Sequence, residues 1–297
     1  MAVSPRQMAI CELQTRKIVV SFGKMQSPKT IHTGPLFLVA CQWFENLVGH
    51  ICGQGGIWAN HSAMLKLRTK ITNRGHMKAT RGSQKWLQVG VNESPEVLNS
   101  AIRVAAKMAP DTAIEWLSPL ESADYAEYRD QAFVKKLGLN LDNRPLNEFW
   151  PPRGPVWDGL ARTSTGEVLL VEAKAHIPEM VTPASQASKL SLERIEKALA
   201  ETRRVLAPRT TVSWTGTFYQ YTNRLAHLYF LRGINRKKVR LVFLYFIGDS
   251  DVRGPDSREK WEGAIQVTEA YLGLGRHNLS AYVHHAIVDV SLLAREG

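Results

Sequence analysis

The chain of 297 residues holds only three cysteines, Cys11, Cys41 and Cys52, and none of them has the CxxC spacing of a zinc or redox motif. Neither a disulfide framework nor a zinc finger is therefore indicated, and we expect a reducing, cytoplasmic setting. Long apolar runs are also missing. The longest early run, residues 35–41, is far shorter than the roughly 20 residues that span a bilayer, and the N-terminus lacks a signal-peptide layout. No membrane role is expected.

Acidic residues are almost absent from the first 85 positions, which hold 12 Lys and Arg but only Glu12 and Glu45. This segment carries +10 of the net charge of +11, so the remainder is nearly neutral and the high charge is weak evidence for DNA binding. Residues 1–76 also lack any period of 2 or 3.6. We predict a basic, poorly ordered extension or a mis-assigned gene start with translation from Met77. A transit peptide is a third interpretation.

Helix and strand patterns begin near Ser94, an N-cap candidate before Pro95 at the first helical position. Helices are predicted over residues 95–108, 123–137, 191–206, 217–231 and 257–273. Strands are predicted over residues 156–162, 168–175, 239–247 and 286–292. The order predicts a mixed α/β domain over residues 77–297 with a hairpin at its centre, because residues 163–166 have turn chemistry that ends in a glycine.

The predicted hairpin carries the residues with the clearest chemistry. In the second strand Glu172 and Lys174 are two positions apart, so they share one face, while Ala173 points to the other. The first strand brings Asp158 alongside. Two carboxylates at strand ends form an oxygen-lined site suited to Mg²⁺, and a neighbouring lysine can hold the attacking water. This combination suffices for phosphodiester hydrolysis.

The Asp, the hairpin and the Glu-x-Lys resemble the signature of the PD-(D/E)XK, or restriction-endonuclease-like, nuclease superfamily, and the chain looks most like a stand-alone bacterial member. The motif covers about 19 residues, 158 to 176, and Trp157 stands where the motif name has Pro. The resemblance implies a mixed central sheet flanked by helices. It implies that Asp158, Glu172 and the Ala173 carbonyl ligate Mg²⁺, for which Mn²⁺ can substitute, and that Lys174 orients the water.

Further ligands and substrate contacts follow from the same resemblance. Glu127, on the helix predicted before the hairpin, is a candidate extra metal ligand, with Asp130 or Glu121 as alternatives, although a charged surface helix fits the same pattern. Gln220 and Arg224 lie on a polar helix face and are candidate phosphate contacts, with buried hydrogen bonding inside the fold as the alternative. His176 returns to the face of Lys174 and is a candidate substrate contact or a satisfied rim histidine.

The function expected from these residues is Mg²⁺-dependent hydrolysis of DNA, with RNA as a further substrate class. One alternative is a catalytically silent nucleic-acid-binding subunit of a repair or defence complex. The other is a protein unrelated to nucleic acid whose hairpin charges form a structural ion cluster. A nearly neutral domain that acts alone needs a basic stripe for phosphates, drawn from Lys135, Lys136, Arg203, Arg204 and residues 236–240, or else a protein partner.

Overall fold

The computed structural model describes residues 9–13, 16–20 and 78–293, and the chain divides into two units, Met1–Arg68 and Thr69–Gly297. In the first unit, β1 (Ala9–Leu13) and β2 (Arg16–Val20) form an antiparallel pair. The extension predicted over residues 1–76 otherwise lies outside the described residues. None of the described helices has both the length and the apolar composition of a membrane span.

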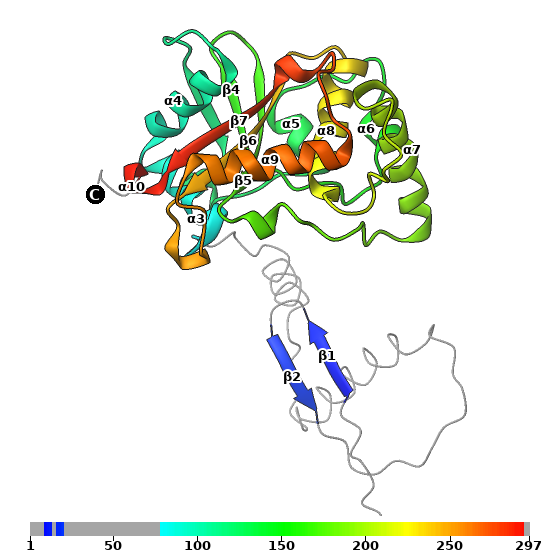
Figure 1. The fold of residues 1–297 in the computed structure, drawn as a ribbon, viewed down its shortest axis with the longest axis horizontal. Helices are drawn as coiled ribbons and strands as arrows, with labels where there is room; N and C mark the ends of the chain where they lie inside the picture. Colours follow the sequence, from blue (N-terminus) through cyan, green and yellow to red (C-terminus); the bar gives the residue numbers. More distant parts are fainter. Residues whose placement is uncertain (1–8, 14–15, 21–77, 294–297) are drawn as a thin grey trace, which may run out of the picture. The chain divides into compact units, whose positions relative to one another are not determined.

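The second unit is built on a five-stranded mixed sheet with the strand order β3-β4-β5-β6-β7 (Figure 1). The strands are β3 (Ile114–Ser118), β4 (Gly159–Thr163), β5 (Val168–Lys174), β6 (Val239–Ile247) and β7 (Val283–Asp289). β3, β4 and β5 pair antiparallel, whereas β5, β6 and β7 pair parallel. The predicted mixed α/β class is confirmed, and β5 is the strand at which the two halves of the sheet meet.

Helices cover both faces of this sheet. The longer ones are α3 (Gly82–Asn92), α4 (Pro95–Ala106), α5 (Asp130–Lys136), α7 (Lys189–Leu206), α8 (Tyr219–Leu228) and α9 (Arg258–Leu272). The short ones are α6 (Leu146–Phe149) and α10 (Val290–Leu293), and α8 continues into a π-helical segment, Tyr229–Ile234. Short 3₁₀ turns span Glu121–Ala123, Ile177–Glu179 and Ser250–Val252. The last 3₁₀ turn, Ser280–Tyr282, precedes β7.

The alternation of side chains along β5 separates two apolar cores. Val168 and Leu170 pack in the core that α5 to α9 cover. Leu169, Val171 and Ala173 pack in the core that α3, α4 and α10 cover. Burying one such side chain fully stabilises the fold by about 1.5–3 kcal/mol, so this strand has little freedom to rotate or to slip in register.

The structure corrects several predicted boundaries. The helix predicted over residues 123–137 is wrong in its first half: Asp124 and Tyr125 have positive φ, which a right-handed helix does not allow, and α5 begins only at Asp130. Residue Tyr128 instead forms an isolated antiparallel bridge with Trp157. The last strand begins at Val283, earlier than predicted, and gives way to α10 after residue 289. Helix α3 and strand β3 were not predicted.

Candidate active site

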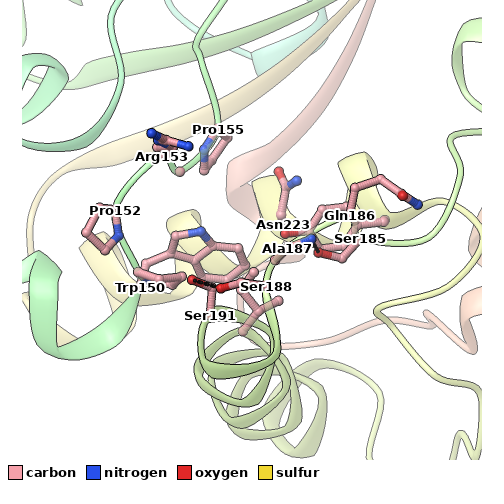
Figure 2. Close-up of a pocket in the computed structure, with 14 residues that line it drawn as sticks. Trp150, Pro152, Arg153, Pro155, Ser185, Gln186, Ala187, Ser188, Ser191 and Asn223 are labelled. Atoms are coloured by element: carbon pink, nitrogen blue, oxygen red, sulfur yellow. Dashed lines mark hydrogen bonds between the residues drawn. The ribbon is translucent and has the colours of Figure 1, made fainter. Parts of the chain in front are cut away.

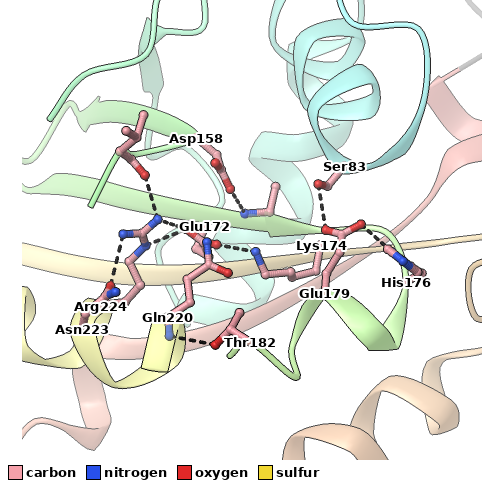
Figure 3. Close-up of polar contacts among 12 residues, drawn as sticks. Ser83, Asp158, Glu172, Lys174, His176, Glu179, Thr182, Gln220, Asn223 and Arg224 are labelled. Atoms are coloured by element: carbon pink, nitrogen blue, oxygen red, sulfur yellow. Dashed lines mark hydrogen bonds and ion pairs between the residues drawn. The ribbon is translucent and has the colours of Figure 1, made fainter. Parts of the chain in front are cut away.

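Glu172 and Lys174 lie at the C-terminal end of β5 (Figure 3). Ala173 and Ala175 alternate with them and pack in the core beneath α3 and α4, so the two charged side chains point to the opposite face, towards α8. Glu172 is only 1% exposed and Lys174 only 8%. Charges so deeply buried need partners, and the two side chains form an ion pair with each other.

Asp158 reaches the same place from the neighbouring strand. Gly159 pairs with Val171 in the antiparallel hairpin, so Asp158, which immediately precedes β4, lies opposite Glu172. Its Oδ2 accepts a hydrogen bond of 2.8 Å from the backbone N–H of Ala173. The hairpin therefore brings together the three side chains that the sequence selects, while their catalytic roles remain predictions.

Arg224 of α8 completes the cluster. Its Nε donates to Oε2 of Glu172 at 2.6 Å, its Nη2 to the carbonyl of Val156 at 2.7 Å, and its Nη1 to Oδ1 of Asn223 at 3.2 Å. The guanidinium also lies 4.6 Å from the ring centroid of Trp157. Because Arg224 is 2% exposed, its donors are used inside the protein. A phosphate contact, as predicted for this residue, would require some of these bonds to open.

Burial and charge shift the pKa values of this cluster in different directions. Burial, reinforced by the negative charge of Glu172, raises the pKa of Asp158 to about 7. Burial alone would also raise the pKa of Glu172, but the cations of Arg224 and Lys174 outweigh it and lower that pKa. The pKa of Lys174 is raised, because the two carboxylates outweigh the effect of its burial. Two acids and two bases thus leave the cluster close to neutral.

The predicted polar face of α8 divides between the cluster and the core. Asn223 and Arg224 join the cluster, and the side chain of Gln220 points towards Glu172 (Figure 3). His227, one turn further on, is 1% exposed and packs against the rings of Trp150, Phe133 and Trp157. Its Nδ1 donates to the carbonyl of Asn223 at 2.8 Å. Buried hydrogen bonding, the alternative to phosphate contact, therefore describes Arg224 in this structure, and it describes His227 as well, whereas Gln220 stays a predicted phosphate contact.

The buried His227 is expected to make the protein sensitive to acid. Burial lowers its pKa to about 3 from the ordinary 6.5, so the unfolded chain takes up a proton before the folded chain does. The stability that this group contributes is full above pH 6.5 and is lost as the pH falls towards 3. At pH 4.5 the loss amounts to about 2–3 kcal/mol.

His227→Asn, which keeps a donor for the Asn223 carbonyl, is expected to abolish that part of the pH dependence. Urea unfolding at pH 7.5 and pH 4.5 measures it. The difference in unfolding free energy between the two pH values should shrink by about 2 kcal/mol in the variant, and an unchanged difference would exclude His227 as the source.

His176 follows β5 in an extended conformation and is held by Glu179. Its Nδ1 lies 2.6 Å from Oε1 of Glu179, and the other carboxylate oxygen accepts a hydrogen bond of 3.0 Å from Oγ of Ser83. These residues border a cavity of about 420 Å³ together with Arg81 and Gln84. The N-terminal end of α3 is therefore part of the site region, which the sequence did not indicate.

Glu127 lies in the non-helical segment before α5. The bridge between Tyr128 and Trp157 is antiparallel, so continuing its register sets the backbone of Glu127 opposite that of Asp158. Its side chain accepts a hydrogen bond of 2.8 Å from Nε2 of Gln84. The predicted position on a helix is wrong, yet the residue does flank the hairpin, and its role as a metal ligand remains a prediction.

A second cavity, of about 410 Å³, opens beside α8 (Figure 2). Trp150, Arg153 and Pro155 line one side of it, Gln186 and Ser188 the other. Asn223, which binds Arg224, also borders this space, so the cavity adjoins the charged cluster. The proline-rich segment that leads into the hairpin therefore forms a wall next to the candidate site.

One part of the predicted phosphate stripe, residues 236–240, lies elsewhere. Arg240 pairs with Leu169 near the start of β5, whereas Glu172 lies at the end of that strand. The guanidinium of Arg240 forms an ion pair with Glu167. Lys237 is paired with Asp142. The basic residues 236–240 thus lie at the other end of the strands, away from Glu172, Lys174 and Asp158.

The donors for a divalent ion are few. Among the described residues no group of three or more His, Cys, Asp and Glu side chains could hold a metal ion. Asp158 and Glu172 are two carboxylates at one place, and the pKa of Asp158 is raised partly by the charge of Glu172. A divalent cation would relieve this repulsion, so the two acids fit such an ion if the ammonium of Lys174 moves off Glu172.

Comparison with known proteins adds no identification. No protein-family model, curated protein or solved structure matches the chain.

Proposed function

We propose that the unit Thr69–Gly297 is a metal-dependent nuclease of restriction-endonuclease-like fold that hydrolyses DNA phosphodiester bonds. The observation that carries the proposal is the hairpin: it sets Asp158 opposite Glu172 and puts Lys174 on the same strand face. Hard oxygen ligands beside a buried ammonium suit the charge that develops during phosphodiester hydrolysis.

In this proposal each residue has a defined task. Asp158, Glu172 and the carbonyl of Ala173 hold Mg²⁺ or Mn²⁺, which when bound supplies Lewis-acid catalysis and lowers the pKa of a coordinated water. Lys174 donates a hydrogen bond that orients the attacking water. Arg224 keeps Glu172 ionised and fixes its carboxylate through two donors.

A specific observation favours a second candidate, a structural ion cluster without metal. Oε1 of Glu172 is engaged by Lys174 and Oε2 by Arg224, so both carboxylate oxygens already have cationic partners. A buried cluster of this kind can serve to fix the packing of α8 against β5. The two candidates differ in whether the protein binds a divalent ion.

Titration calorimetry of the full chain with Mn²⁺ and with Mg²⁺ separates them. We expect the wild type to bind the metal ion. The Asp158→Asn variant should bind it at least about tenfold more weakly. Because protons compete for a carboxylate whose metal-free pKa is about 7, binding should be tighter at pH 8 than at pH 6. Asp142→Asn is the matched control, because its exposed ion pair with Lys237 lies next to the start of β6, at the end of the strands away from Glu172.

Cleavage is then measured on linear, circular, single-stranded and branched DNA, and on RNA in parallel. Metal-dependent cleavage supports the nuclease. Metal binding without cleavage of any substrate would favour the silent nucleic-acid-binding subunit, and the absence of metal binding at both pH values would favour the structural cluster.

A further inference from the structure

We propose that the cavity of about 410 Å³ beside α8 holds a second phosphate of the DNA strand, a neighbour of the phosphate that is cleaved, and that Arg153 pairs with it. The inference rests on the proposed nuclease function and names a part of the substrate that is bound outside the catalytic cluster. It is carried by the chemistry of the cavity wall, by the guanidinium of Arg153 and by the contact of the cavity with Arg224 through Asn223 (Figure 2).

The wall of the cavity offers hydrogen-bond donors from three separate segments. These are residues 150–155 before the hairpin, residues 185–191 around the start of α7, and Tyr219 and Asn223 of α8. They present a guanidinium, two side-chain amides and four hydroxyls, and the described residues that line the cavity include neither Asp nor Glu. A wall of this composition favours an anion, and phosphate oxygens accept hydrogen bonds from all three kinds of donor.

Arg153 has a fixed backbone and a free side chain. Its φ is 64°, and its backbone N–H donates to Oδ2 of Asp130 at 3.0 Å. The N–H of Gly154 donates to Oδ1 of the same carboxylate at 2.8 Å, so Asp130 is engaged by the loop itself. The side chain of Arg153 is exposed, and it forms no ion pair or hydrogen bond with another described residue. Its guanidinium is therefore available for a bidentate contact with a phosphate.

The inner end of the cavity lies against Arg224. Asn223 is 6% exposed and borders the cavity, and its Oδ1 accepts from Nη1 of Arg224 at 3.2 Å. On the opposite wall Pro155 precedes Val156, whose carbonyl accepts from Nη2 of the same guanidinium at 2.7 Å. Nε of Arg224 donates to Glu172 at 2.6 Å. The cavity and the proposed metal ligand Glu172 are thus joined through the side chain of Arg224.

Neutral donors complete the inner wall. Burial raises the pKa of Tyr219, although the side chains of Ser185 and Asn223 and the charge of Arg224 oppose the rise. The phenol therefore stays protonated and can donate. Ser188, which precedes α7, donates its hydroxyl to Ser191 at 3.2 Å and does not cap the helix. The guanidinium and the buried amide define the site, and the start of α7 adds to its positive potential.

The spacing of phosphates in DNA fits this placement. Along one strand they follow each other at about 3.4 Å of helix rise per nucleotide. An enzyme that holds one phosphate at Asp158 and Glu172 therefore meets the next ones close by. The basic residues 236–240 lie at the other end of the strands and do not serve there. A phosphate held in the cavity would instead fix the register of the strand over the metal ligands.

The test combines a variant of Arg153 with DNA in which one phosphate is neutral. Around the bond that the wild type cleaves, the two nearest phosphates on each side are replaced, one at a time, by an uncharged methylphosphonate. For the wild type we expect one of these replacements to raise KM by about tenfold, the size of one charged hydrogen bond. The kcat should be unchanged, because the contact is the same in the ground state and the transition state. Arg153→Ala should raise KM on unmodified DNA by the same factor.

Combining the two changes tests whether they remove the same contact. In Arg153→Ala the neutral phosphate should raise KM by less than about twofold further, because the guanidinium and the phosphate charge are lost as one pair. Arg209→Ala is the matched control. Arg209 is exposed and follows the C-terminal end of α7, about 27 Å of helix away from Ser188. This variant should keep the full effect of the neutral phosphate.

The outcomes separate the two proposals. If the two losses multiply to about 100-fold in the combination, Arg153 and that phosphate act independently. This result would overturn the phosphate site and leave the nuclease intact. The same conclusion follows if none of the neutral phosphates changes KM for the wild type. A wild type that cleaves no DNA and no RNA overturns the nuclease, and the phosphate site with it.

Discussion

Replacing Lys174 by alanine is expected to slow metal-dependent cleavage by about three orders of magnitude, the middle of the range for a side chain that assists the reacting water. The ammonium lies at the end of β5 beside two carboxylates, which raise its pKa and keep it protonated. No other described lysine forms an ion pair with Glu172. Single-turnover rates at saturating Mn²⁺ measure the loss without interference from product release.

Two controls make this result specific. Lys237→Ala removes a lysine whose ion pair with Asp142 is exposed, and it should leave the rate unchanged. Metal affinity should be retained or increased in Lys174→Ala, because the ammonium no longer competes for Glu172. A variant that cleaves at more than about one tenth of the wild-type rate would show that Lys174 does not assist the water.

Replacing Arg224 by alanine should lower the free energy of unfolding by about 3–5 kcal/mol, since removing one partner of a buried ion pair leaves the other charge uncompensated. The guanidinium is the only contact from α8 to Oε2 of Glu172 among the described residues, and it also satisfies the carbonyl of Val156. Urea unfolding in the absence of metal gives the value.

A second pair of variants tests whether the lost stability comes from the uncompensated charge of Glu172 or from the loss of packing around Arg224. In Arg224→Met the volume of the side chain is largely kept, and combining it with Glu172→Gln removes both charges. We expect the double variant to be more stable than Arg224→Met alone by about 1–3 kcal/mol. Equal stability of the two variants would mean that the uncompensated charge of Glu172 is not the reason for the loss.

The hairpin could be predicted from the sequence because its signals are local. An apolar run buried on both faces defines β5, and Gly166 adopts the positive φ, 79°, that the turn requires. Once the turn is placed, the register sets Asp158 opposite Glu172 without further information. The three candidate catalytic residues can thus be predicted from the short segment that forms the hairpin.

The remainder of the site could not be predicted because its contacts are distant in the sequence. The polar stripe of α8 indicates a face but not which residue it meets, so the bond from Arg224 to Glu172 was not foreseen. Ser83 lies at the start of α3, a helix that was not predicted, and meets Glu179 across 96 positions. The break before α5 depends on backbone angles at Asp124 and Tyr125 that the charge pattern does not reveal.

The position of β5 between the antiparallel and the parallel half of the sheet has a consequence for folding. The contact from Asp158 to Ala173 closes a loop of 15 residues, whereas those from Arg224 to Glu172 and from Ser83 to Glu179 span 52 and 96. Short loops close before long ones. We therefore expect the two carboxylates to come together in water first, and to lose their hydration when α8 brings the guanidinium of Arg224 onto Glu172.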